Sequence, residues 1–253
     1  ALCALAALAV PAGAADVAEP APATVDRAAA RLAQAALRSD EALALVSSLT
    51  TEVGPRFAGT PGERAAIDWA QREFTRLGFQ RLRTQEVWVP RWVRGEASFA
   101  VVQPYPQDMP VLALGGSVGT ADGGLEAALV AVPDIDALRA LPAGAAAGKI
   151  VFLHGRTARG RDITAYRRAV RARSDGAAAA AAQGAVAVVI RSIGTGNNRF
   201  PHTGTVNYNI SQPRIPAVAL SNPDADALER QLASGREVRV RFRVTARDLP
   251  QRG

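Results

Sequence analysis

Cysteine and histidine are scarce in this sequence, and their scarcity limits the metal chemistry that it can support. The 253 residues include one cysteine, Cys3, and two histidines, His154 and His202. A lone cysteine can form neither a disulfide bond within the chain nor a cysteine-based zinc site. The sequence contains no H-E-x-x-H motif and no His-x-Asp motif. Because a catalytic zinc ion typically takes three protein ligands, we expect no zinc site within this chain.

Lysine is almost absent, although the chain is basic. Lys149 is the only lysine among 30 basic residues, and the formal net charge is +7. Aromatic residues make up 5% of the sequence and are rarely interleaved with the arginines. Surfaces that bind single-stranded nucleic acid combine a positively charged groove with aromatic residues that stack on the bases. We therefore expect no nucleic-acid partner.

Long hydrophobic runs are missing as well. No stretch approaches the roughly 20 apolar residues of a transmembrane helix, so we expect no membrane span. A short apolar run at 1–10 is followed by Pro11 and by a small-x-small pattern at 12–14, which is typical of the end of a secretory signal. We interpret residues 1–14 as a signal peptide remnant and expect a secreted or periplasmic protein. The alternative is an ordinary alanine-rich helix.

The first third of the chain has helical patterns. Residues 25–38 predict a helix, and Ser39 is placed to cap a second one. The sequence TPGE at 60–63 combines an N-cap threonine, a proline at the first helical position and a capping-box glutamate, and Gly78 would end this helix. Residues 82–89 alternate in part and predict a strand.

After residue 90 the pattern changes to short apolar runs between glycine and proline turns. Two helices are expected here, at 175–183 and 224–232. A compact, β-rich α/β module of this size is therefore expected. The predicted strands are 99–102, 111–114, 127–132, 150–153, 186–190, 215–220 and 238–244.

Two segments have features of functional sites, each with a structural alternative. GGSVG at 115–119 matches the G-x-S-x-G pattern of serine hydrolases, but the following TADGG does not predict the helix that a nucleophile elbow needs, so a plain turn is favoured. The segment 156–173 contains seven arginines and one acidic residue, Asp162. It could be an anion- or partner-docking surface, or a solvated helix face and loop.

Six segments, taken in order, resemble one known family, the zinc exopeptidases of the carboxypeptidase Q type, also called plasma glutamate carboxypeptidase. The resemblance covers about residues 40–246. The segments are LTTEVGPRFAGTPG at 49–62, VWVPRWVRG at 87–95, LALGGSVGT at 112–120, GKIVF at 148–152, GAVAVVIRS at 184–192 and PHTG at 201–204.

The resemblance implies an α/β fold with an inserted domain. Residues 15–89 would form the N-terminal helices and first strand of a zinc exopeptidase domain. Residues 90–246 would be an inserted, β-rich protease-associated domain, and 247–253 a linker to a missing catalytic domain. The domain assignment is thus 1–14, 15–89, 90–246 and 247–253.

The resemblance also implies a function for the full-length protein. That protein would hydrolyse peptides as a zinc-dependent exopeptidase of the carboxypeptidase, dipeptidase or aminopeptidase type, with two zinc ions and a peptide substrate. A homodimer is one assembly that the resemblance allows. No catalytic or metal-binding residue carries over to this chain, so the fragment alone is expected to be inactive. The alternative is a non-catalytic protease-associated module that binds peptides or a partner. His202, Asn207 and Tyr208, in a polar loop, are candidates for substrate or partner contacts.

Overall fold

The structure is a computed structural model that describes residues 22–252, so the predicted signal remnant at 1–14 lies outside the described residues. The chain divides into two compact units. The helical unit contains described residues 22–57 and 61–82, and the sheet unit contains 58–60 and 83–252. None of the helices in the described part is both long enough and apolar enough to cross a membrane.

The helical unit consists of α1 (Pro22–Arg38), α2 (Glu41–Ser48), a π-helical turn η1 (Leu49–Val53) and α3 (Pro61–Arg76). These helices confirm the pattern predicted from the sequence. One detail differs, because Asp40 and not Ser39 occupies the N-cap of α2. The Ser39 hydroxyl accepts a hydrogen bond from the Glu41 amide at 3.2 Å, so it still satisfies one free amide of the first turn.

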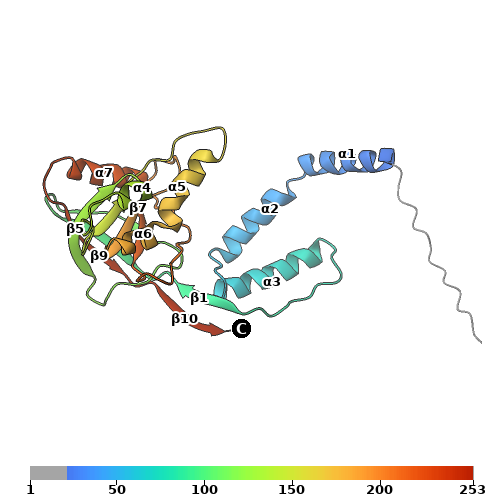
Figure 1. The fold of residues 1–253 in the computed structure, drawn as a ribbon. Helices are drawn as coiled ribbons and strands as arrows, with labels where there is room; N and C mark the ends of the chain where they lie inside the picture. The colour runs from blue at the N-terminus through green and yellow to red at the C-terminus, as the bar shows by residue number, and fades with distance from the viewer. Residues whose placement is uncertain (1–21, 253) are drawn as a thin grey trace, which may run out of the picture. The chain divides into compact units, whose positions relative to one another are not determined.

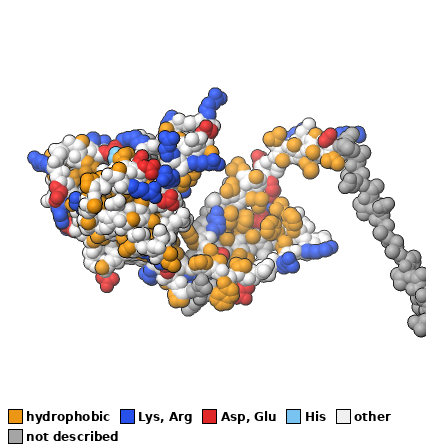
Figure 2. Space-filling view, viewed as in Figure 1, with side chains coloured by type: hydrophobic (Ala, Val, Ile, Leu, Met, Phe, Trp, Pro, Cys, Tyr) orange, Lys and Arg blue, Asp and Glu red, His pale blue; other side chains and the backbone are white. Residues whose placement is uncertain are grey.

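Hydrophobic side chains remain exposed in the helical unit. Neither α2 nor α3 has a buried residue. Figure 2 shows hydrophobic side chains gathered over α2 and α3, and they include Leu43 and Phe74, which are 65% and 46% exposed. The Trp69 indole donates to the Ser48 hydroxyl at 2.8 Å and thus joins α3 to α2. The described helices α2 and α3 are therefore joined by polar contacts such as this one and have no buried residue between them.

The strand predicted at 82–89 is wrong. Residues 79–88 have no regular structure, and β1 runs from Val89 to Val93 instead. A strand needs a partner, and β1 has one in β10 (Arg247–Arg252), which pairs with it in antiparallel fashion (Figure 1). Val87 and Trp88 are 59% and 69% exposed. The side chains of 82–88 are therefore exposed and cover no sheet within the described residues.

The sheet unit is built on a mixed, eight-stranded sheet with the order β3-β2-β9-β5-β6-β7-β8-β4. Strands β5, β6, β7 and β8 are parallel neighbours, and the remaining pairs are antiparallel. All seven strands predicted after residue 90 are confirmed. These seven strands are β2 (Ala97–Gln103), β4 (Val111–Ala113), β5 (Leu125–Val132), β6 (Ile150–Leu153), β7 (Ala187–Arg191), β8 (Ala217–Leu220) and β9 (Arg239–Val244). The remaining strand of this sheet, β3 (Gln107–Asp108), is not among the predicted ones.

The two faces of the sheet have separate cores because side chains alternate along each strand. On β6, Ile150 and Phe152 belong to one hydrophobic cluster, and Val151 and Leu153 belong to the other. The first cluster also includes residues of β2, β4 and β9, because the sheet curls until β2 and β4 pack together. All four β6 side chains are buried, as expected for a strand inside a parallel sheet.

Four helices cover these cores. Side chains of α4 (Ile135–Arg139), α5 (Thr164–Ser174) and α6 (Gly176–Ala182) pack on one face, and α7 (Asn222–Leu232) packs on the other. The helices predicted at 175–183 and 224–232 are α6 and α7. The structure therefore confirms the α/β class, with N-terminal helices followed by a β-rich module. Residues 247–252, predicted as a linker, form β10.

Candidate functional site

The carboxyl ends of β5, β6 and β7 lie at the same edge of the sheet because these strands are parallel. The loops that leave them begin with Pro133, His154 and Ser192. In α/β proteins with parallel sheets, ligands commonly bind in the crevice outside these carboxyl ends. This edge of the sheet unit contains two polar features, an ion-pair cluster and a pocket.

Arg191, the last residue of β7, is the centre of the ion-pair cluster, which also includes Arg156, Asp226 and Glu229. Its side chain is 1% exposed. The Nε atom donates to the His154 carbonyl at 2.8 Å, and Nη1 lies 2.6 Å from Asp226 Oδ1. The Nη2 atom lies 3.0 Å from Glu229 Oε2 as an ion pair without hydrogen-bond geometry. A buried guanidinium is thus neutralised by two carboxylates of α7.

The two carboxylates are three residues apart on α7 and therefore share one helix face. Burial raises the pKa of Asp226, but hydrogen bonds from Arg191 and Arg156 outweigh it and hold the pKa below its ordinary value. The pKa of Glu229 is lowered in the same way. Burial raises this pKa, but the charges of Arg191 and Arg156 and the hydrogen bond from His154 lower it by more. His154 Nδ1 lies 2.8 Å from Glu229 Oε1, and it carries the proton because a carboxylate only accepts.

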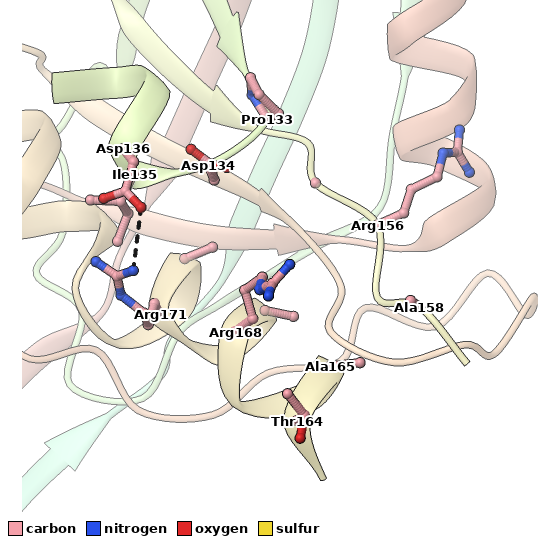
Figure 3. Close-up of a pocket in the computed structure, with 13 residues that line it drawn as sticks. Pro133, Asp134, Ile135, Asp136, Arg156, Ala158, Thr164, Ala165, Arg168 and Arg171 are labelled. Atoms are coloured by element: carbon pink, nitrogen blue, oxygen red, sulfur yellow. Dashed lines mark hydrogen bonds and ion pairs between the residues drawn. The ribbon is translucent and has the colours of Figure 1, made fainter. Parts of the chain in front are cut away.

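A pocket of about 440 Å³ lies beside this cluster, between α5 and the loops after β5 and β6 (Figure 3). Gly155 allows the two loops to approach, because a Cβ atom there would collide with the Pro133 carbonyl oxygen. The lining residues are Pro133, Asp134, Ile135, Asp136, Gly155, Arg156, Ala158, Thr164, Ala165, Arg168, Ala169, Arg171 and Ala172.

Most charged groups in the pocket already have partners. Asp134 caps α4, where its Oδ1 accepts the Ala137 amide at 2.8 Å. Arg171 lies 3.5 Å from Asp136 (Figure 3), and Arg156 pairs with Asp226 and Glu229 at 2.7 Å. Arg168 is different, since its guanidinium has no hydrogen bond or ion pair within the described residues.

The three predicted contact residues lie outside this pocket, and no hydrogen bond joins their side chains in the described structure. Tyr208 Oη accepts the Val118 amide at 3.1 Å and donates to the Ile215 carbonyl at 2.7 Å. Burial raises its pKa. His202 and Asn207 are exposed, and their backbone amides bond to the Ser192 hydroxyl and to the Ser174 carbonyl. Tyr208 thus joins its loop to the backbone at Val118 and Ile215. A role of the three residues in substrate or partner contacts stays a prediction.

The structure does not support a nucleophile at Ser117. Its side chain is buried, and its hydroxyl accepts the Ala217 amide at 2.9 Å. No helix follows it directly, since the next one is α4. The favoured interpretation of GGSVG as a plain turn agrees with this geometry, because an elbow serine must be exposed above the sheet.

Residues 119–228 match the model of the PA domain family. The chain contains a PA domain. The pocket lies within the matched residues, and so does the ion-pair cluster except for Glu229, which is one residue beyond the match. The match falls inside the range of 90–246 predicted for this domain, whose exact limits stay a prediction.

Curated relatives are similar to a larger part of the chain. Carboxypeptidase Q of Mus musculus is 32% identical over 213 residues, and that of Bos taurus is 33% identical. Each alignment covers 84% of this chain but 43% of the relative, so the chain spans less than half the length of these relatives. The predicted resemblance to carboxypeptidase Q is confirmed.

Solved structures of peptidases share the fold. The peptidase M28 precursor from Shewanella amazonensis SB2B has 40% sequence identity and a TM-score of 0.85, over 89% of this chain and 51% of that one. A zinc aminopeptidase from Bacillus subtilis, BSAP, has 23% identity and a TM-score of 0.51, over 79% of this chain and 42% of that one. The second likeness concerns the fold alone.

Sequence reasoning missed the two most informative side chains of the PA domain. Arg168 was one of seven arginines in 156–173, and Arg191 ended a hydrophobic strand without any distinguishing motif. The one available signal for Arg191 was its position, since a charged residue directly after AVVI at the end of a buried strand needs a partner.

Proposed function

We propose that the full-length protein is a secreted or periplasmic zinc-dependent exopeptidase that hydrolyses peptides. In this proposal the chain supplies the PA domain and an N-terminal helical segment, and it does not include the metal-binding catalytic core. The observation that carries the proposal is the 40% identity and TM-score of 0.85 shared with the peptidase M28 precursor over 89% of the chain.

The described residues do not fit a zinc site. No group of three or more histidine, cysteine, aspartate or glutamate side chains among residues 22–252 could hold a metal ion. His154 is engaged with Glu229, and His202 lies in an exposed loop. The proposal therefore assigns the two zinc ions to parts of the full-length protein that this chain does not contain, and no catalytic step is derived for these residues.

The exposed apolar side chains of the helical unit support a larger peptidase domain. Leu43, Val46, Ile67 and Phe74 are each at least 42% exposed, although helices with such faces usually pack against another layer. The curated relatives are more than twice as long as the aligned region. We propose that the remainder of the exopeptidase domain covers these side chains in the full-length protein.

A peptidase assay on two proteins tests the proposal. The full-length protein and this chain are each incubated with short peptides whose N-terminus, C-terminus or neither is blocked. We expect the full-length protein to cleave from one free end, to lose activity with a chelator and to regain it with zinc, while this chain has no activity. Full-length protein without peptidase activity, or activity that survives metal removal, would contradict the proposal.

The second candidate is a non-catalytic PA module that binds peptides or a partner, and the open pocket on the PA domain favours it. The two candidates differ in the assay, because a binding module would retain peptides without cleaving them. A homodimer is a further part of the proposal, and sedimentation of the full-length protein tests it directly.

A further inference from the structure

One cation of the pocket beside α5 has no hydrogen-bond or ion-pair partner in the part of the chain that the structure describes. Arg156 is held by two carboxylates of α7, and Arg171 is paired with Asp136. The Asp134 carboxylate is engaged at the start of α4. Arg168 lies in the middle of the view in Figure 3, among these residues, and its guanidinium makes no hydrogen bond or ion pair within residues 22–252. Its five N–H donors are therefore available to a ligand.

The surroundings of Arg168 favour an anion. Arg159, Arg161 and Arg167 lie close in sequence and likewise have no ion-pair partner among the described residues. The acidic residue of this segment, Asp162, accepts the Thr164 amide at 2.9 Å, and this hydrogen bond lowers its pKa. Uncompensated positive charge around a concave surface raises the local concentration of anionic ligands.

The shape and lining of the pocket favour a peptide over a compact ion. Its volume of about 440 Å³ lies in the range of sites for small molecules and short peptide segments. Ala165, Ala169 and Ala172 lie on one face of α5 and give the pocket a small, apolar wall. Such a wall can contact methylene groups of a ligand whose charged end reaches Arg168.

We propose that this pocket binds a peptide segment that carries a carboxylate, with Arg168 as the residue that anchors the carboxylate. A planar guanidinium suits a carboxylate because it can donate two parallel hydrogen bonds. The carboxylate can belong to an acidic side chain or to a C-terminus, since both present the same group. The inference concerns binding by the PA domain and holds whether or not the full-length protein is a peptidase.

Titration of this chain with three short peptides tests the inference and identifies the source of the carboxylate. The probes are N-acetylated Ala-Ala-Glu with an amidated C-terminus, N-acetylated Ala-Ala-Gln with a free C-terminus, and N-acetylated Ala-Ala-Gln with an amidated C-terminus. Binding is followed by calorimetry and by NMR shifts of the α5 amides. We expect saturable binding of at least one of the first two peptides, with a dissociation constant below about 1 mM, and none of the third.

Matched variants connect the binding to the pocket. Arg168→Gln should weaken binding roughly 10-fold or more, the usual effect of losing a charged hydrogen-bond donor. Arg168→Lys keeps the charge without the planar fork and should give a smaller loss. Ala165→Leu narrows the pocket, keeps every charge and should also weaken binding. Arg167→Gln is the control, because it removes the same charge from the same helix outside the pocket.

Three results would overturn the inference. Equal losses in the Arg167 and Arg168 variants would mean diffuse attraction by the arginine-rich surface. Equal binding of the neutral third peptide would show that the pocket does not recognise the carboxylate. Saturable binding of inorganic phosphate with no binding of either acidic peptide would assign the pocket to a different class of ligand. None of these results depends on peptidase activity, so they are separate from the test of the proposed function.

Discussion

Removal of the Arg191 guanidinium should destabilise the PA domain more than removal of the guanidinium of any exposed arginine. Arg191→Met keeps much of the volume and the apolar stem but removes a cation that is 1% exposed. It would leave Asp226 with Arg156, and Glu229 with Arg156 and His154. It would also leave the carbonyl groups of His154 and Asn222 without their guanidinium donors.

The magnitude follows from these contacts. Removing one partner of a buried ion pair usually costs 3–5 kcal/mol, and an ordinary hydrogen bond contributes about 1 kcal/mol. The carboxylates are 32% and 26% exposed, so water and Arg156 can compensate part of the lost charge. We therefore expect a loss of about 3 kcal/mol in the free energy of unfolding, which corresponds to roughly 6–12 °C in melting temperature for a unit of this size.

The assay is thermal and urea unfolding of the chain, combined with hydrogen exchange of the β6 and β7 amides to locate the change. Arg156→Met is the control, because it removes a guanidinium from the same carboxylates but its side chain is 61% exposed. Exposed ion pairs contribute about 0–1 kcal/mol. If the two variants lose the same stability, or if Arg191→Met loses less than about 1 kcal/mol, the ion-pair cluster does not stabilise the fold as argued.

Three further predictions concern pH, the polar loop and the two units. The pKa values of Asp226 and Glu229 in the folded state are lowered from 3.8 and 4.5, so their contribution to the free energy of unfolding is present above those values and is lost as the pH falls below about 4.5. The stability of Arg191→Met should therefore depend less on pH in this range. An unchanged pH profile in this variant would show that the two carboxylates do not cause the acid sensitivity. Replacement of Tyr208 by phenylalanine should cost about 1–2 kcal/mol from two lost hydrogen bonds, and unchanged kinetics and assembly in the full-length enzyme would end its candidacy as a contact residue. In this chain alone, amides in 22–57 and 61–82 should exchange faster than those in 90–246, because α2 and α3 have no buried residue. Equal protection of the two parts would contradict this reasoning.

The sequence predicted those elements whose signals are local. Seven strands after residue 90 could be placed because each is a short apolar run that ends at a turn, and α3 could be placed because its first residues carry their own capping signals. The strand predicted at 82–89 failed for the opposite reason. Alternation is a local pattern, whereas a strand requires a neighbour, and the pairing with β10 begins at Val89.

The candidate site could not be predicted because it depends on pairing across long separations in sequence. Arg191 meets Asp226 from 35 residues away, and Arg156 meets Glu229 from 73 residues away. The arginines of 156–173 look equivalent in the sequence. The structure shows that Arg156 and Arg171 are paired, and that Arg168 lines the pocket without an ion pair among the described residues. The sequence therefore predicts the charge of the segment but not which arginine faces the pocket without a partner.

The ion-pair cluster and the pocket share the loop that follows β6, and this connects stability with binding. Arg191 holds the carbonyl of His154, and the Thr157 hydroxyl accepts the Gly194 amide at 3.0 Å. Gly155, Arg156 and Ala158 of the same loop line the pocket. A buried ion pair is by itself weak evidence for stability, but here it fixes a loop that has no helix or strand of its own. A ligand that binds only the ordered loop stabilises the intact ion-pair cluster. By thermodynamic linkage, the intact cluster increases the binding free energy of the ligand by the same amount.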